Sequence, residues 1–179
     1  MNFIIFDTET TGLLLPSNAP LDAQPQIIEL GAVLCDGNGV RAELSQLIDP
    51  GQPLPAEITK ITGIRDEDLA GKPTFAEFLP ALKLFFADAD FLICHNAPFD
   101  SGMLRNELQR ADCEDFPWPK EILCTAQEYA ARFGRRPRMN QLYERIIGKP
   151  LAQTHRALDD ARALHEILVK DGLLAKLGS

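Results

Sequence analysis

Short apolar runs and longer amphipathic segments alternate along this chain. Nearly continuous apolar runs occur at residues 3–6, 27–35, 91–95 and 122–124. Runs of this length are typical of strands that are buried on both faces. The second run is followed by Asp36-Gly37-Asn38-Gly39, residue types that favour a tight hairpin turn. We therefore predict that residues 40–48 return as an antiparallel strand, so that the chain opens with three strands.

Helical patterns fill most of the remaining sequence. Helices and short helical turns are expected at 53–70, 74–87, 98–111, 125–133, 139–147 and 156–170. Thr74 and Glu77 have the spacing of a capping box, and Pro98 and Thr125 fit helix starts, the latter as an N-cap. Residues 14–26 contain three prolines and are expected to form a loop. Three strands followed by alternating helices and strands predict an α/β domain with a mixed sheet.

Composition agrees with one such domain and excludes several other classes. The 179 residues, 45% hydrophobic and 25% charged, suit a single domain over 1–179. No apolar run reaches the length of a membrane span, so no membrane association is expected. The N-terminus lacks a basic region before its apolar residues, which argues against a signal peptide. The four cysteines lack metal-site spacing, and buried, reduced thiols in a cytoplasmic protein are expected.

Two carboxylates follow the first apolar run directly. Asp7 and Glu9 are spaced i and i+2, so in a strand they project from the same face. Repulsion and desolvation both oppose two negative charges at the end of a core strand. A divalent cation between them would remove this cost, and carboxylate oxygens suit Mg²⁺ or Mn²⁺.

Further ionisable residues occur where later elements begin. Asp100 opens the helix after the third apolar run, and His155, Asp159 and Asp160 open the helix at 156–170. Ligand sites of α/β sheets gather at the carboxyl ends of strands, which favours grouping Asp100 with the first pair. Each feature alone also fits a solvated strand end, a helix-dipole interaction or a surface histidine. Their joint occurrence favours a metal-dependent active site.

The motifs DTETTGL, HNAPFD and HRALDDA occur in this order, and together they resemble the three motifs of DEDDh 3′–5′ exonucleases. That family includes ribonuclease T, oligoribonuclease and the proofreading epsilon subunit of bacterial DNA polymerase III. The segments KITGI and KPTFAEF resemble connecting segments of epsilon-type members in particular. The resemblance covers Asn2 to about Lys170. It implies an RNase H-like mixed sheet of about five strands, the second antiparallel, flanked by helices.

The resemblance also implies roles for individual residues. Asp7, Glu9, Asp100 and Asp160 match the four carboxylates that bind two Mg²⁺ ions, for which Mn²⁺ would substitute. His155 matches the general base, and the family spacing of histidine and aspartate selects Asp160 rather than Asp159. The implied reaction is two-metal hydrolysis of phosphodiester bonds from a 3′ end, which releases nucleoside 5′-monophosphates.

Substrate contacts are implied for a second group of residues. These are Thr8, Thr10, Thr11, Gly12, Leu13, Ile64, His95 and Asn96. Leu13 and Ile64 would wedge against the terminal bases, although both also fit a core position. His95 equally fits a buried, hydrogen-bonded histidine. Four basic residues lie in ARFGRRPRM and would hold phosphates or form a solvated loop. They are Arg132, Arg135, Arg136 and Arg138.

Three functional interpretations follow. A 3′–5′ exonuclease on DNA, with a preference for single-stranded or frayed ends, is the first. An exoribonuclease of the ribonuclease T or oligoribonuclease type shares the same motifs, and a catalytically silent nucleic-acid or polymerase-binding module is the alternative of another class. The net charge of −8 argues weakly against a broad nucleic-acid surface. Epsilon-type subunits carry a polymerase-binding segment after the penultimate helix, and GLLAKLGS does not match it, so a stand-alone enzyme is expected.

Overall fold

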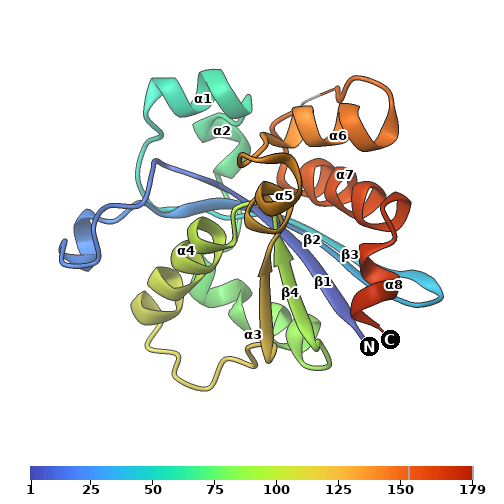
Figure 1. The fold of residues 1–179 in the computed structure, drawn as a ribbon. Coiled ribbons are helices and arrows are strands. Elements are labelled where there is room, and N and C mark those ends of the chain that lie inside the picture. The colour runs from blue at the N-terminus through green and yellow to red at the C-terminus, as the bar shows by residue number, and fades with distance from the viewer. Residues whose placement is uncertain (153, 179) are drawn as a thin grey trace.

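A five-stranded mixed sheet forms the centre of the molecule in a computed structural model that describes residues 1–152 and 154–178 (Figure 1). The strand order is β3-β2-β1-β4-β5. The strands are β1 (Phe3–Thr10), β2 (Ile27–Asp36), β3 (Gly39–Leu47), β4 (Phe91–Cys94) and β5 (Glu121–Cys124). β2 pairs with β1 and β3 in antiparallel fashion, whereas β4 pairs with β1 and β5 in parallel. The predicted mixed sheet and its antiparallel second strand are confirmed.

The hairpin between β2 and β3 has the predicted turn. Asp36 pairs with Gly39, which leaves Gly37 and Asn38 as the loop. Gly39 has a φ of +121°, a conformation that L side chains rarely adopt. A carboxylate oxygen of Asp36 accepts a hydrogen bond from the amide of Asn38 at 2.7 Å. The turn residues therefore fix the register of the two strands.

Helices surround the sheet in nearly the predicted order. They are α1 (Ala56–Thr62), α2 (Asp66–Leu69), α3 (Phe75–Phe86), α4 (Ala97–Arg110), α5 (Thr125–Phe133), α6 (Met139–Ile147), α7 (Ala157–Lys170) and α8 (Leu173–Leu177). The capping box of Thr74 and Glu77 is confirmed at the start of α3. The prediction that Thr125 is an N-cap is wrong, because Cys124 holds that position and Thr125 is the first residue of α5. A 3₁₀ turn at Leu21–Ala23 and helix α8 were not predicted.

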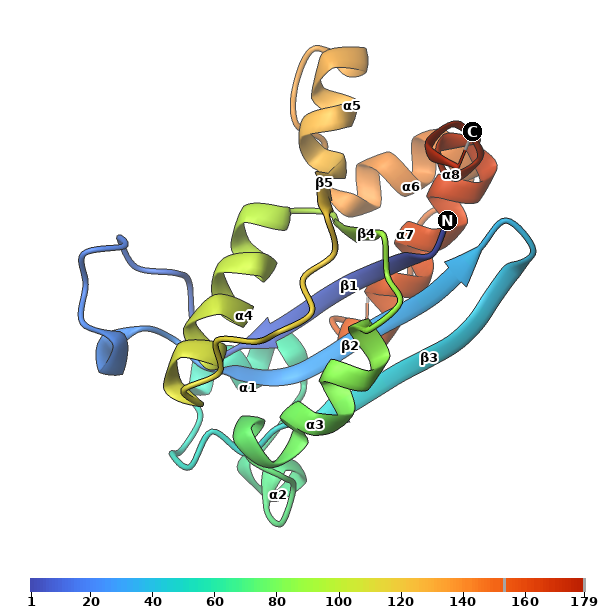
Figure 2. The same ribbon diagram turned by 90° about the horizontal axis from the view of Figure 1, so that it is seen from below.

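The helices form a layer on each face of the sheet (Figures 1 and 2). Ile4 and Phe6 of β1 belong to the core beneath α3 and α4. Phe3 and Ile5 point the other way, into the core formed with α6, α7 and α8. Because side chains alternate along a strand, Asp7 and Glu9 continue the row of Phe3 and Ile5. The sequence pattern therefore turns both carboxylates towards the face that α7 covers.

The four cysteines differ in their burial. Cys35, Cys94 and Cys124 are buried, Cys113 is half-buried, and all four are free thiols. Within residues 1–152 and 154–178, no helix is long and apolar enough to cross a bilayer.

Candidate active site

The predicted carboxylates meet in one cavity of about 210 Å³. Asp7 and Glu9 come from the last four residues of β1, Asp100 from the first turn of α4, and Asp160 from the first turn of α7. The cavity is lined by Asp7, Thr8, Glu9, His95, Asn96, Phe99, Asp100, Met139 and Asp160. Parallel pairing of β1 with β4 brings α4 to this edge, and the packing of α7 against β1 and β2 brings Asp160 there. The topology thus unites residues far apart in the sequence.

His155 lies beside two of these carboxylates. One ligand atom each of Glu9, His155 and Asp160 lies within 4.8 Å of the others, a separation that one metal ion could span. His155 has a φ of +48°, in the left-handed region that non-glycine residues rarely adopt. This conformation costs about 1 kcal/mol, so surrounding contacts must hold the residue in place.

The side chain of Asp100 is buried and is hydrogen-bonded within the protein. Its side chain is only 3% exposed. One carboxylate oxygen accepts a hydrogen bond from the hydroxyl of Thr8 at 2.9 Å. Thr8 lines the cavity but is largely buried, and its hydroxyl fixes the orientation of Asp100; its contact with substrate stays a prediction.

Crowding and burial shift the pKa values of all four carboxylates upward. Burial raises the pKa of Asp7 well above its ordinary value, and Asp100 and Asp160 raise it further. The pKa of Glu9 is raised to about 8, first by burial and then by Asp160 and Glu29. Burial raises the pKa of Asp100 to about 7 and also raises that of Asp160. These raised pKa values mean that the ionised carboxylates are destabilised in the empty cavity. A bound cation would stabilise the ionised carboxylates and is therefore favoured.

The donor set fits a hard divalent cation. Four carboxylates and one imidazole supply oxygen ligands with a single nitrogen, and no cysteine lines the cavity. Mg²⁺ and Mn²⁺ prefer such ligands, whereas thiolates favour zinc. Asp7, Glu9, Asp100 and Asp160 are therefore the residues that could hold metal ions here.

Two of the predicted substrate contacts are open to solvent. Leu13 is 81% exposed in the segment that follows β1. Asn96 is exposed, lines the cavity, and as the N-cap residue of α4 makes no side-chain capping bond. Asn96 is therefore accessible to a ligand that enters the cavity, whereas Leu13 is open to solvent outside the cavity lining.

The threonines after Glu9 have partners within the protein. The hydroxyl of Thr10 donates to the carbonyl of Gly12 at 2.7 Å. The amide of Thr11 donates to the carbonyl of Gln26, and the Thr11 hydroxyl oxygen accepts from the Gln26 amide, both at 2.9 Å. A Cβ on Gly12 would meet only Pro25, at an ordinary 3.8 Å. The protein's own packing therefore does not require glycine at position 12.

Ile64 is a core residue. It is 3% exposed and packs with Ile28 and Leu69 beneath α1 and α2. This enclosure fits the core position that the sequence left open, and contact of Ile64 with substrate stays a prediction.

His95 is hydrogen-bonded through both ring nitrogens. Nδ1 lies 3.1 Å from the hydroxyl of Thr125, and Nε2 lies 3.0 Å from the carbonyl of Pro137. His95 therefore connects the end of β4 with α5 and with the loop that leads to α6. Although it lines the cavity, its polar atoms are already engaged.

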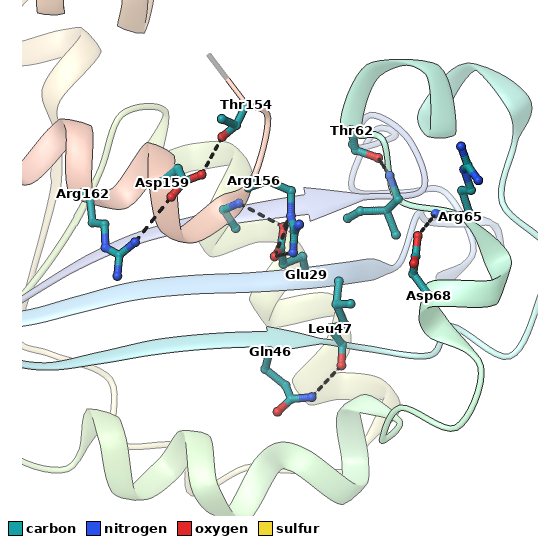
Figure 3. A network of polar contacts seen from close by, with 12 residues as sticks. Glu29, Gln46, Leu47, Thr62, Arg65, Asp68, Thr154, Arg156, Asp159 and Arg162 are labelled. Atoms are coloured by element: carbon teal, nitrogen blue, oxygen red, sulfur yellow. Dashed lines mark hydrogen bonds and ion pairs between the residues drawn. The ribbon is translucent and has the colours of Figure 1, made fainter. Parts of the chain in front are cut away.

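Asp159 differs from Asp160 in its surroundings. It is exposed, accepts a hydrogen bond from the hydroxyl of Thr154 at 2.8 Å, and pairs with Arg162 at 3.5 Å (Figure 3). It does not line the cavity that Asp160 lines. The geometry agrees with the spacing argument that selected Asp160.

An ion pair between a buried glutamate and an exposed arginine lies beside the cavity and was not predicted. Glu29 of β2 is 1% exposed and binds Arg156, the residue directly after His155 (Figure 3). The available sequence signal was an acidic residue inside an apolar run, together with an arginine inside the motif HRALDDA. Neither signal shows that Glu29 and Arg156 bind each other, because most of the chain separates β2 from α7.

The arginine cluster divides into two parts. Arg132 pairs with Asp171 on the side of the molecule that carries α7 and α8. Arg135, Arg136 and Arg138 are exposed in the loop between α5 and α6, and no ion pair holds them among the described residues.

Comparison with known proteins identifies the family. A family model described as an exonuclease matches residues 4–168. The chain belongs to this exonuclease family. The exonuclease is 35% identical over 168 residues to the DNA polymerase III subunit epsilon of Treponema pallidum, covering 92% of this chain and 74% of that protein. It is 34% identical over 183 residues to a Mycobacterium tuberculosis protein named as a bifunctional exonuclease/endonuclease, covering 99% of this chain but only 27% of that protein.

Solved structures support the same assignment at the level of fold. The exonuclease superposes on the nuclease domain of 3′hExo, a DEDDh family member solved with rAMP, with a TM-score of 0.75 at 20% identity. The match covers 96% of this chain and 92% of that one. The DEDDh resemblance and the RNase H-like fold are thus confirmed, as is the expectation of a nuclease enzyme. DEDDh exonucleases generally use divalent metal ions.

Proposed function

We propose that this exonuclease hydrolyses DNA from the 3′ end in a Mg²⁺-dependent reaction that releases nucleoside 5′-monophosphates. The observation that carries the proposal is the meeting of Asp7, Glu9, Asp100 and Asp160 in one cavity with His155 beside it. Single-stranded or frayed ends suit this site, because a cavity of about 210 Å³ has room for little more than a terminal nucleotide.

Each residue of the cluster has a distinct part in the proposed reaction. Two bound Mg²⁺ ions would activate the attacking water and stabilise the leaving 3′ oxygen. Asp7, whose pKa is raised by burial and by Asp100 and Asp160, would help to hold both ions; Glu9 and Asp160 would hold one, and Asp100 the other. A ring nitrogen of His155 would take the proton from the attacking water, a task suited to an imidazole near neutral pH.

The exposed residues near the cavity would position the terminal nucleotide. Leu13 offers an apolar surface on which a base can pack without regard to sequence. Asn96 offers a side-chain amide with no capping partner. Gly12 is not demanded by internal packing, and its lack of a side chain would allow the substrate to approach the backbone closely.

The strand upstream of the cleavage site would follow the loop between α5 and α6. This loop carries Arg135, Arg136 and Arg138, and its Pro137 carbonyl is held by His95 of the cavity wall. Met139, the next residue after this basic stretch, itself lines the cavity. A flexible cation without an ion-pair partner can bind phosphates at little cost.

DNA is the first-choice substrate because the similar relatives include DNA polymerase III proteins. A 3′–5′ exoribonuclease is the second candidate, because the cluster of carboxylates would act on the phosphodiester and does not distinguish deoxyribose from ribose.

The decisive experiment is a time course on matched 5′-labelled DNA and RNA single strands with Mg²⁺. We expect a ladder that shortens from the 3′ end, faster on DNA.

Three variants test the assignment of the cluster. We expect Asp7→Ala to lower the cleavage rate by on the order of 10³-fold or more, because metal binding supplies several kcal/mol of stabilisation. His155→Ala should lower it by about 10²–10⁴-fold, the usual contribution of a general base. Asp159→Asn is the matched control and should cleave like the unchanged protein. Cleavage activity that persists in Asp7→Ala would contradict the assignment of the metal site. Cuts within the strand would contradict an exonuclease. Metal binding without any cleavage would favour a catalytically silent binding module.

A further inference from the structure

The carboxylate of Glu29 accepts hydrogen bonds from Arg156 and Ala157, two residues that lie between His155 and Asp160 in the sequence. The Nε atom of Arg156 donates to Oε1 and Oε2 of Glu29 at 3.1 and 3.0 Å, and Nη2 donates to Oε1 at 2.7 Å. The amide of Ala157, the first residue of α7, donates to Oε2 at 3.1 Å. Forked contacts between arginine and carboxylate fix orientation as well as distance. Glu29 therefore holds both the side chain and the backbone at the residues that follow His155.

A second contact presses the same turn of α7 against β2. A Cβ on Gly31 would lie 2.1 Å from the carbonyl carbon of Ala157 and from the amide nitrogen of Leu158. Gly31 is the register partner of Asp7, and Glu29 is the register partner of Glu9. The first turn of α7 thus rests on β2 directly opposite the two β1 carboxylates.

The two residues that need this placement lie on either side of Arg156. His155 precedes it, in a left-handed conformation that local preference does not supply. Asp160 follows one turn later, and its amide donates to the carbonyl of Arg156 at 3.0 Å. Arg156 itself gives no side-chain cap to α7, so the Glu29 carboxylate takes that place. A displacement at Arg156 would move the base and a metal ligand together.

We propose that Glu29 and Arg156 form a positioning pair that sets His155 and Asp160 against Asp7 and Glu9, an inference that rests on the proposed function. The pair acts through other residues and does not touch the substrate. Arg156 also offsets part of the negative charge that the buried Glu29 places next to Glu9. Loss of such supporting contacts around a metal site typically costs 10–100-fold in metal affinity or activity.

The chain offers a matched control on the same helix. Arg162 of α7 binds Glu43 of β3, with Nε donating to Oε1 at 2.9 Å. Both side chains are partly exposed, at 50% and 35%. This pair joins α7 to the sheet in the same forked way, but it lies beyond Asp160 and away from the cavity lining. Arg162→Met therefore removes an α7–sheet ion pair, together with the exposed contact of Arg162 with Asp159, and leaves the contacts of Glu29 with Arg156 and Ala157 in place.

The test compares Arg156→Met, Arg156→Lys and the double variant Glu29→Gln/Arg156→Met with Arg162→Met. We expect Arg156→Met to lower kcat by about 10–100-fold and to raise the Mg²⁺ concentration for half-maximal activity, with little change in KM. Arg156→Lys keeps the charge but loses the fork, and should lie between. The double variant removes the buried unpaired carboxylate, so its melting temperature should recover while kcat stays low.

Hydrogen exchange of the metal-free protein supplies a readout that needs no activity. The amides of residues 157–161 should exchange faster in Arg156→Met than in the unchanged protein, and at the unchanged rate in Arg162→Met. Normal kcat in Arg156→Met, or an equal loss in Arg162→Met, would overturn the positioning pair. If kcat recovered along with the melting temperature in the double variant, the pair of Glu29 and Arg156 would only stabilise the fold and would not position the active site. If instead His155→Ala and Asp7→Ala stay active, the proposed function itself fails.

Discussion

Glu9 has a half-buried carboxylate with three acidic neighbours, and this affects the pH dependence of stability. Its pKa is raised to about 8 from an ordinary 4.5, first by burial and then by Asp160 and Glu29. In the metal-free protein, the unfolded chain releases the Glu9 proton at a lower pH than the folded one does. The free energy of unfolding therefore falls as the pH rises from about 4.5 to about 8.

Glu9→Gln removes this pH-dependent loss. We expect the melting temperature of metal-free Glu9→Gln to exceed that of the unchanged protein by a margin that grows from pH 5 to pH 8. Thermal unfolding in the presence of a chelator at several pH values measures the margin. If the difference in melting temperature were the same across this pH range, the Glu9 carboxylate would carry the same charge in the folded and the unfolded protein.

Leu13 and Ile64 were predicted to act together, and the structure separates them. We expect Leu13→Ala to raise KM several-fold without lowering the melting temperature, because the side chain is 81% exposed. Ile64→Ala should instead destabilise the fold by about 2–5 kcal/mol and leave KM of the folded fraction unchanged, because it opens a cavity in the core. Denaturant unfolding and steady-state kinetics on the two variants distinguish these effects. An Ile64→Ala variant with normal stability and raised KM would support its predicted contact with substrate.

At the scale of elements, the loop between α5 and α6 carries charge towards the cavity. Replacing Arg135, Arg136 and Arg138 by alanine together should raise KM for single strands of several nucleotides but not for dinucleotides. Each phosphate contact on a single strand contributes about 0.7 to the salt slope, so the slope of log kcat/KM against log salt should become shallower by about 2. Kinetics at several salt concentrations measure this slope. Arg132→Ala is the control: it breaks the pair with Asp171 and should lower stability while leaving the salt slope unchanged.

Local sequence signals located most elements, and tertiary contacts account for the exceptions. The apolar runs, the Asp36–Gly39 turn and the Thr74 capping box are local features, and the structure has all three. Thr125 has the residue type of an N-cap, but its hydroxyl bonds the ring of His95, the residue that follows β4. Nothing near Thr125 in the sequence reveals that partner.

The same distinction applies to the site. Asp7, Glu9, Asp100 and Asp160 were found because each follows a strand or opens a helix in a recognisable motif. Glu29 was missed because a glutamate within an apolar run gives no sign of its partner. The partner, Arg156, lies at the far end of the chain and reaches β2 only through the packing of α7 on the sheet. Motifs therefore identified the groups proposed to react but not the contacts that position them.

At the scale of the whole molecule, a net charge of −8 must be reconciled with a polyanionic substrate. Four carboxylates of the proposed site contribute to that charge and face the cavity where a phosphate would lie. Without a cation, repulsion from these groups opposes binding of a strand. Bound divalent ions would reverse the local charge and would supply much of the attraction for phosphate. Metal is therefore expected to control substrate binding as well as chemistry.

The His155→Ala variant allows binding to be measured apart from cleavage, because it keeps the four carboxylates. We expect a labelled single strand to bind this variant at least about tenfold more tightly in Mg²⁺ than in a chelator at equal ionic strength, since about 1.4 kcal/mol of attraction suffices. Fluorescence anisotropy measures both affinities. Adding Asp7→Ala to the variant should remove the difference, because the site can then no longer hold its ions. Equal affinity with and without Mg²⁺ would place the strand outside the reach of the carboxylates, and the arginines of the α5–α6 loop would then account for binding alone.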